Sequence, residues 1–229
     1  PEPELLPPPL VTLEKASVGY VNNLPVLSNI NLRLDADDRI GFLGQNGNGK
    51  STLAKLIANR LEKMSGESHR AAKLKVGFFA QHQVEDLELE DTATEHMARL
   101  MPSAAIDKVR ARLGGVGLLQ DKQTTKVKFL SGGEKVRCML SKMMMSRANV
   151  LMLDEPTNHL DLESITAFNN ALKNFKGTLL CSTHDHAFAQ TVGTRILELT
   201  PKGIIDRYSS FDDYMSDPKV KELRVKMYT

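Results

Sequence analysis

A glycine-rich run at residues 44–51 is the part of this sequence whose residue types point most directly to chemistry. It has the spacing G-x-x-x-x-G-K-[ST]. Its glycines allow backbone N–H groups to turn inward around phosphate oxygens, while Lys50 can reach the terminal phosphates and the Ser51 hydroxyl can bind Mg²⁺. The run therefore predicts a nucleotide-binding loop. The residues expected to contact the nucleotide there are Gly44, Asn46, Gly47, Asn48, Gly49, Lys50, Ser51 and Thr52.

Two adjacent carboxylates, Asp154 and Glu155, are the second chemical feature. They follow an apolar run at 150–153, which predicts a strand buried on both faces that ends at the carboxyl edge of a parallel sheet. Neighbouring strand residues point to opposite sides, so the two acids cannot contact one ligand in the same way and should have different roles. Pro156 then ends the strand. Alone, such a pair is also typical of a solvated junction between strand and loop. The glycine-rich run upstream favours a shared site instead.

The elements that must position these residues are visible in the hydrophobic pattern. A short apolar strand is expected at 40–43, and leucine and isoleucine recur at helical spacing over 53–61. This strand, loop and helix are the context that a phosphate-binding loop requires, and they disfavour a chance glycine-rich turn. The new helix would also point its positive dipole end at the phosphates.

A further helix start lies at residues 130–134. Ser131 and Glu134 have the spacing of a capping box, and an apolar helix face follows at 136–144. Ser-x-x-Glu alone is typical of an ordinary helix cap. Gly132 and Gly133 beside this cap change the interpretation, because they leave N–H groups bare and let a phosphate approach.

Taken together, these motifs resemble those of the ATP-binding-cassette (ABC) ATPases. The signature of that family is matched by Leu130, Ser131, Gly132, Gly133 and Glu134. The run Leu-Asp-Glu-Pro-Thr-Asn-His-Leu-Asp at 153–161 narrows the resemblance to the ABC-F group of soluble cassette proteins, most of which act on ribosomes. The resemblance implies ATP and Mg²⁺ as cofactors, and a signature that closes on the ATP of a second cassette.

The resemblance also implies catalytic roles. Asp154 would complete a magnesium shell begun by Ser51, and Glu155 would be the base that polarises the attacking water. Gln81, after a buried strand at 76–80, would touch Mg²⁺ or that water, and His184 would contact the γ-phosphate. A lone histidine at a strand end is otherwise usually structural.

Contacts to the base and to the partner cassette are implied in the same way. Tyr20 falls where an aromatic ring stacks on adenine in the family, with Val26 beside it, although a tyrosine at a strand end is often only packing. Leu160 and Asp161 belong to the turn that crosses the interface between two cassettes. His186 stands where ABC-F proteins usually have arginine, and we assign it no role.

The composition is that of an ordinary globular domain. The 229 residues carry a formal net charge of +2 and are 41% hydrophobic and 25% charged. With no apolar run of membrane-spanning length and no signal peptide, we expect a soluble, cytoplasmic chain, and the initial proline suggests a piece of a longer protein. Cys138 and Cys181 are expected to be buried reduced thiols.

The predicted fold class is α/β: a P-loop ABC ATPase domain with a parallel-sheet nucleotide-binding core, an antiparallel β-subdomain and a small helical lobe. The antiparallel strands are expected within 10–20 and at 30–34, and a helical stretch at 92–119 has a capping-box spacing at its start, in Thr92 and Glu95. A hairpin is expected from the strands 195–199 and 203–208, followed by a short helix that contains Phe211, Tyr214 and Met215. The expected organisation is a proline-rich linker at 1–9, a cassette at 10–216 with its lobe at about 90–145, and a charged tail at 217–229. That tail is either a solvated helix face or a contact to ribosomal RNA.

One phosphate loop and one signature cannot complete a site alone, so the chain needs a second cassette, from another copy or from the same parent chain. The proline-rich lead-in and the short connection after Gln81 favour the second cassette of an ABC-F protein that acts on the ribosome. The alternatives are the motor subunit of a membrane transporter and a DNA-repair ATPase.

Overall fold

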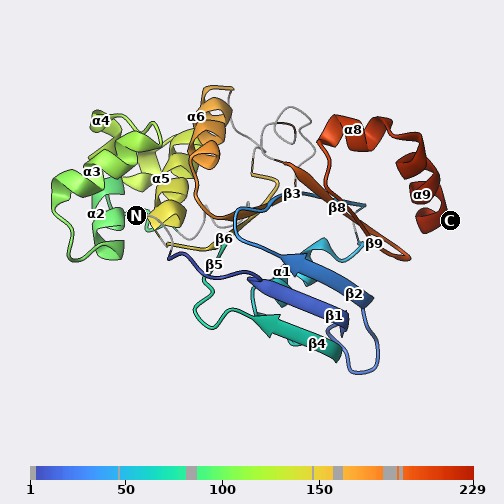
Figure 1. Cartoon of the computed structure of the whole chain (residues 1–229). Coiled ribbons are helices and arrows are strands. Elements are labelled where there is room, and N and C mark those ends of the chain that lie inside the picture. The colour runs from blue at the N-terminus through green and yellow to red at the C-terminus, as the bar shows by residue number, and fades with distance from the viewer. Residues whose placement is uncertain are drawn as a thin grey trace.

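Two β-sheets and a group of helices make up the part of the chain that the computed structural model describes, residues 4–45, 47–80, 87–145, 147–156, 162–182, 190 and 193–229. Figure 1 shows the helical lobe at one end of the larger sheet and the two last helices at the other. The smaller sheet lies on one face of the larger sheet, opposite helix α6 (Leu162–Lys173). This arrangement confirms the predicted fold class.

The larger sheet has six strands among the described residues. Their order is β5 (Val76–Ala80), β6 (Val150–Asp154), β7 (Thr178–Ser182), β3 (Arg39–Gly44), β8 (Arg195–Thr200) and β9 (Gly203–Arg207). All neighbours pair in parallel except β8 and β9, which form the hairpin that the sequence predicted. Parallel strands place their carboxyl ends at one edge, so β3, β5, β6 and β7 all end at the same edge of the sheet.

The smaller sheet is antiparallel, with β1 (Val11–Val18) between β2 (Leu27–Leu34) and β4 (Ser65–Arg70) in the described part of the chain. Alternating apolar residues predicted β1 and β2 correctly. The sequence did not predict β4, because its residues are polar and mostly exposed. Only backbone pairing to β1 makes this segment a strand, and edge strands of that kind leave little signal in residue types.

The helical lobe contains α2 (Ala93–Leu100), α3 (Ile106–Gly115), α4 (Gln120–Gln123), the 3₁₀ turn η2 (Val127–Phe129) and α5 (Gly132–Met145). The stretch expected to be helical at 92–119 contains two helices, because the chain leaves helical geometry between Leu100 and Ile106, where Pro102 cannot donate a backbone hydrogen bond. The predicted cap of α2 is confirmed: Glu95 N–H donates to the Thr92 hydroxyl at 3.1 Å, and Thr92 N–H donates to the Glu95 carboxylate at 2.8 Å.

Three further helices border the larger sheet. Helix α1 (Lys50–Ile57) ends earlier than the predicted run to residue 61, because Asn59 takes a left-handed backbone with φ 58°. Helix α8 (Phe211–Ser216) is the expected short helix, and α9 (Pro218–Tyr228) contains the charged segment. Val220 of α9 is buried with Phe211 and Tyr214 against β8 and β9.

The central strand β6 packs into two cores through its alternating side chains. Leu151 and Leu153 belong to the core under the helical lobe, whereas Val150 and Met152 belong to the core between the two sheets. Its four apolar residues are 0–3% exposed, which confirms the prediction of a strand buried on both faces.

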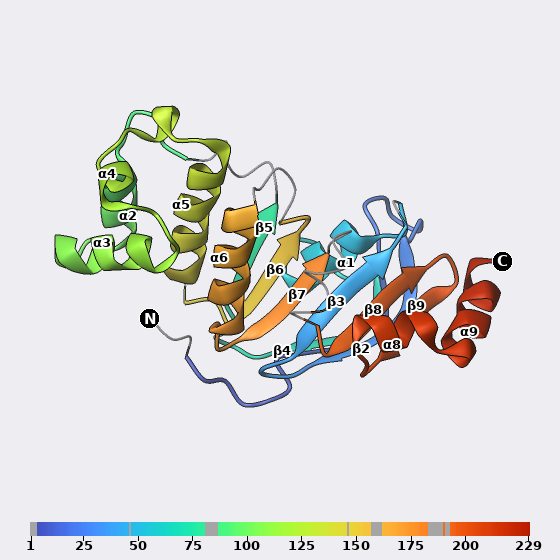
Figure 2. The same cartoon turned by 90° about the horizontal axis from the view of Figure 1, so that it is seen from above.

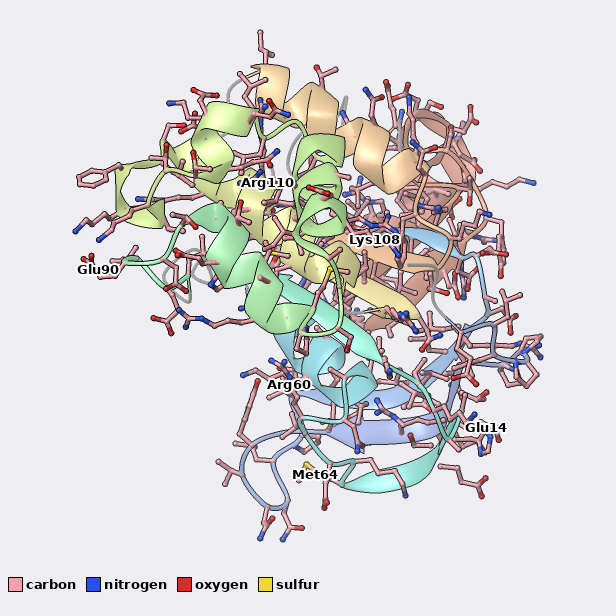
Figure 3. All side chains as sticks on the ribbon, turned by 90° about the vertical axis from the view of Figure 1, so that its left-hand side faces the viewer. Glu14, Arg60, Met64, Glu90, Lys108 and Arg110 are labelled. Carbon is pink, nitrogen blue, oxygen red and sulfur yellow. The ribbon has the colours of Figure 1, made fainter. Side chains whose placement is uncertain are left out.

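Charged side chains cover the outer face of the helical lobe. Figure 3 views the molecule from this end, with Lys108 and Arg110 on α3 and Glu90 before α2, and all three side chains are exposed. Within the described ranges, no helix combines the length and apolar character needed to cross a membrane.

Candidate nucleotide-binding site

The glycine-rich run connects β3 to α1 at the carboxyl edge of the larger sheet. Gly44, Gly47 and Gly49 have φ angles of +142°, +90° and +88°, which residues other than glycine rarely adopt. Space is also limiting: a Cβ on Gly44 would lie 2.7 Å from the Leu199 carbonyl oxygen, and one on Gly49 would lie 2.8 Å from Leu27 Cδ2. Glycines are therefore required both by backbone geometry and by close packing.

Lys50 and Ser51 begin helix α1 directly after the loop. Lys50 Nζ donates to the Gly44 carbonyl oxygen at 2.6 Å, so its ammonium group folds back over the loop. The Asn48 side chain donates to the Leu199 carbonyl oxygen at 3.0 Å, which ties the middle of the loop to β8. One of these bonds therefore ties the loop to the start of α1, and the other ties it to β8.

The two distant motifs meet in one cavity. Lys50 and Ser51 line it together with Asp154, which ends β6. The other lining residues are Phe42, Ala54, Phe78, Met152, Leu153, Leu180 and Ser182. The loop and the acidic strand end therefore lie on the same side of the molecule, as the prediction of a shared site requires.

Ser182 is a lining residue that the sequence reasoning missed. In the strand register, Asp154 pairs with Ala80 of β5 on one side and with Ser182 of β7 on the other. The available signal was its position at the end of a buried parallel strand, where polar side chains reach the site.

Glu155 has an unusual backbone. Its φ angle is +48°, in the left-handed region, and its N–H donates to the Ser182 carbonyl oxygen at 2.9 Å. A glutamate in this region costs roughly 1–2 kcal/mol, and such strain gathers at functional sites. This left-handed residue comes directly after Asp154, and its side chain is half-buried.

Both cysteines are buried and free, as predicted. Burial raises the pKa of the Cys181 thiol well above its ordinary value, and the nearby charges of Glu155 and Asp154 raise it further. Burial also raises the pKa of the Cys138 thiol, to about 11. The shift at Cys181 is therefore mainly a consequence of burial, and the two carboxylates make the smaller contribution.

Tyr20 lies over helix α1 with 56% of its surface exposed. Its hydroxyl accepts hydrogen bonds from Thr52 at 3.4 Å and from Lys55 at 3.3 Å, and the Lys55 ammonium is 5.1 Å from the ring centroid. The bond from Thr52 is the main cause that lowers the pKa of Tyr20. Val26, nearby in sequence, is 45% exposed, so both side chains predicted to contact adenine are accessible at the surface.

The signature forms the exposed start of helix α5. Its capping box is confirmed, with Glu134 N–H donating to the Ser131 hydroxyl at 3.3 Å and Ser131 N–H donating to the Glu134 carboxylate at 2.8 Å. Burial opposes ionisation of Glu134, but these bonds and one to Lys122 lower its pKa overall. Leu130 is buried and anchors the turn, whereas a Cβ on Gly132 would meet no described atom within 4 Å.

The signature lies apart from the cavity, because the residues found to line the cavity are all from β3, α1, β5, β6 and β7. Several other predicted residues fall outside the described part of the chain. These are Asn46, Gln81, Leu160, Asp161, His184 and His186.

Comparison with known proteins gives the same family on independent grounds. Residues 27–158 match the model of the ABC transporter family. The chain is 47% identical over 183 residues to the probable ATP-binding protein YheS of Escherichia coli K12, a match covering 80% of this chain and 29% of that protein. It is 36% identical over 211 residues to ATP-binding cassette sub-family F member 3 of Pongo abelii, covering 92% and 30%. The chain thus spans about three-tenths of each relative.

Solved structures agree on the fold. The dimeric structure of MJ0796, a bacterial ABC transporter cassette, superposes with a TM-score of 0.72 at 22% identity, covering 86% of this chain and 98% of that one. The chain belongs to the ATP-binding-cassette family of ATPase domains, and the sub-family F relative confirms that its resemblance is to the ABC-F group.

Proposed function

We propose that this chain is an ATP-hydrolysing cassette of an ABC-F protein, and that its catalytic residues are those the sequence motifs indicated. The observation that carries the proposal is the cavity in which Lys50, Ser51 and Asp154 come together from two distant motifs. A phosphate-binding cation, a hydroxyl and a carboxylate at one sheet edge are the groups that MgATP requires.

The donors present suit a magnesium ion bound jointly with phosphate. Among the described residues, no group of three or more His, Cys, Asp or Glu side chains could hold a metal by itself. Mg²⁺ is typically bound through only one or two carboxylates and completes its octahedron with waters, substrate phosphates and other oxygen ligands. Ser51 and Asp154, with Gln81, would supply these ligands, and the ion would neutralise charge that develops on the phosphates.

The division of work follows from position. Lys50 binds the β- and γ-phosphates, and the loop N–H groups surround their oxygens. Glu155, on its strained turn just beyond Asp154, accepts a proton from the attacking water, while His184 and Gln81 position that water. Tyr20 and Val26 provide an exposed surface for adenine.

A second cassette is needed to complete this site. The signature of this chain is exposed at the start of α5 and is separate from the cavity beside Lys50. It is therefore placed to serve a nucleotide held by another cassette, and the dimer formed by MJ0796 gives a precedent for such pairing. Leu160 and Asp161 would lie at that interface.

We further propose that ATP-driven closure of two cassettes acts on the ribosome in the cytoplasm. This rests on the ABC-F resemblance, which the sub-family F relative supports. The test is sedimentation of the full-length parent protein carrying Glu155→Gln with ribosomes, with and without ATP. ATP-dependent comigration is expected, whereas its absence would favour a transporter subunit.

A further inference from the structure

The Leu199 carbonyl oxygen joins the phosphate loop to the last helix. It accepts hydrogen bonds from the Asn48 side chain at 3.0 Å and from the Tyr228 hydroxyl at 3.4 Å. Gly44 also passes so close that a Cβ there would lie 2.7 Å from the same oxygen. One buried carbonyl of β8 therefore contacts the loop twice and α9 once.

Tyr228 also reaches the loop directly. The Gln45 backbone, at the entry to the loop, lies near its oxygen and is the smallest of the influences on the pKa of Tyr228, which burial raises overall. Its hydroxyl lies 2.9 Å from Glu198 Oε1, in addition to Leu199. A phenol carries one proton and two acceptor lone pairs, so the hydroxyl donates mainly to Glu198 at 2.9 Å and more weakly to Leu199 at 3.4 Å, and its lone pairs stay available to the nearby Gln45 N–H.

Helix α9 is fixed firmly enough for Tyr228 to keep this position. Glu198 is 1% exposed, and it accepts hydrogen bonds from Arg224 of α9 and from Tyr214 of α8, the latter at 2.6 Å. The Lys202 ammonium in the β8–β9 turn donates to the Lys226 carbonyl oxygen at 3.2 Å. Figure 2 shows α9 lying beside this hairpin, at the end of the sheet opposite the helical lobe.

We propose that Tyr228 is a positioning residue for nucleotide binding, which holds the Gln45 end of the phosphate loop against β8 in the conformation that receives phosphate. The proposal rests on the proposed ATP-binding function. Its physical basis is preorganisation: a loop already held in its bound conformation spends less free energy on ordering when the ligand arrives.

The test compares Tyr228→Phe with Tyr214→Phe in the full chain. Each variant removes one hydroxyl bonded to Glu198, but only Tyr228 also contacts the phosphate loop and Leu199. Nucleotide affinity is measured by calorimetry with MgATP, and turnover by phosphate release, well below the melting temperature of each variant. We expect Tyr228→Phe to raise Kd and KM for ATP by roughly three- to tenfold, the scale of one hydrogen bond, with kcat within about twofold.

Tyr214→Phe serves as the matched structural control. It should lower the melting temperature and leave ATP affinity unchanged, because Glu198 keeps its bonds to Arg224 and Tyr228 of α9 and the lost hydroxyl does not bond to Leu199. Unchanged affinity in Tyr228→Phe would overturn the proposal, and so would an equal loss of affinity in both variants. A wild-type chain that does not bind MgATP would instead contradict the proposed function.

Discussion

Replacing Glu155 by glutamine tests the proposed chemistry with little disturbance of the fold. Glutamine has nearly the same shape and meets the same left-handed backbone at φ 48°, so the strain is equal before and after. We expect the free energy of unfolding to change by less than about 1 kcal/mol. Loss of a general base typically slows a reaction by roughly 10²- to 10⁴-fold, which is about 2.7–5.4 kcal/mol in activation free energy.

The assay separates binding from chemistry. Single-turnover phosphate release should slow by that factor. Calorimetry should give an affinity for MgATP within about threefold of wild type, and size-exclusion chromatography should show a closed dimer held by unhydrolysed ATP. Glu67→Gln, at an exposed position on β4 that does not line the cavity, is the matched control. Wild-type turnover in Glu155→Gln with intact binding would show that another group activates the water.

Three further perturbations test the loop and the buried thiol. Lys50→Ala removes the cation over the loop and should abolish measurable ATP binding in calorimetry; unchanged binding contradicts a phosphate-binding loop. Gly49→Ala should lower the free energy of unfolding, measured in urea, by about 2 kcal/mol. A φ angle of +88° is strained for alanine, and its Cβ would lie 2.8 Å from Leu27 Cδ2. Gly132→Ala is the control and should change the free energy of unfolding far less, because a Cβ there meets no described atom within 4 Å. Burial raises the pKa of the Cys138 thiol from an ordinary value of 9.0 to about 11, so the stability that this neutral thiol contributes is complete below pH 9 and is lost as the pH rises towards 11. In urea unfolding, the free energy of unfolding of Cys138→Ala should therefore fall less steeply between pH 9 and 11 than that of the wild type. An equally steep fall in both proteins would refute this assignment.

The parts of the fold that could be predicted are those in which one strong physical requirement decides the residue type. A parallel strand buried on both faces must be apolar throughout, so 150–153 identified β6. The phosphate loop must turn at positive φ, so its glycines were diagnostic at Gly44 and Gly49. The capping boxes at Thr92 and Ser131 depend on local spacing, and both were read correctly.

The parts that could not be predicted depend on distant contacts. Strand β4 forms because β1 offers it an edge, although its own residues are polar. Ser182 lines the cavity because of the strand register, and its only sequence signal is its position at the end of a buried strand, which does not say which neighbours it meets. The contact of Tyr228 with Leu199 joins the last helix to β8, and a tyrosine in a charged segment carries no signal of it.

The two-sided packing of β6 has a mechanical consequence. Because its alternate side chains are embedded in both cores, neither the helical lobe nor the antiparallel sheet can shift without pulling on the same five residues, the last of which is Asp154. Strand β6 is therefore common to both cores, and its last residue is the carboxylate that lines the cavity. A large-to-small substitution that leaves a cavity in either core, for instance at Leu151 or Met152, should therefore change the rate of ATP hydrolysis as well as lower the free energy of unfolding.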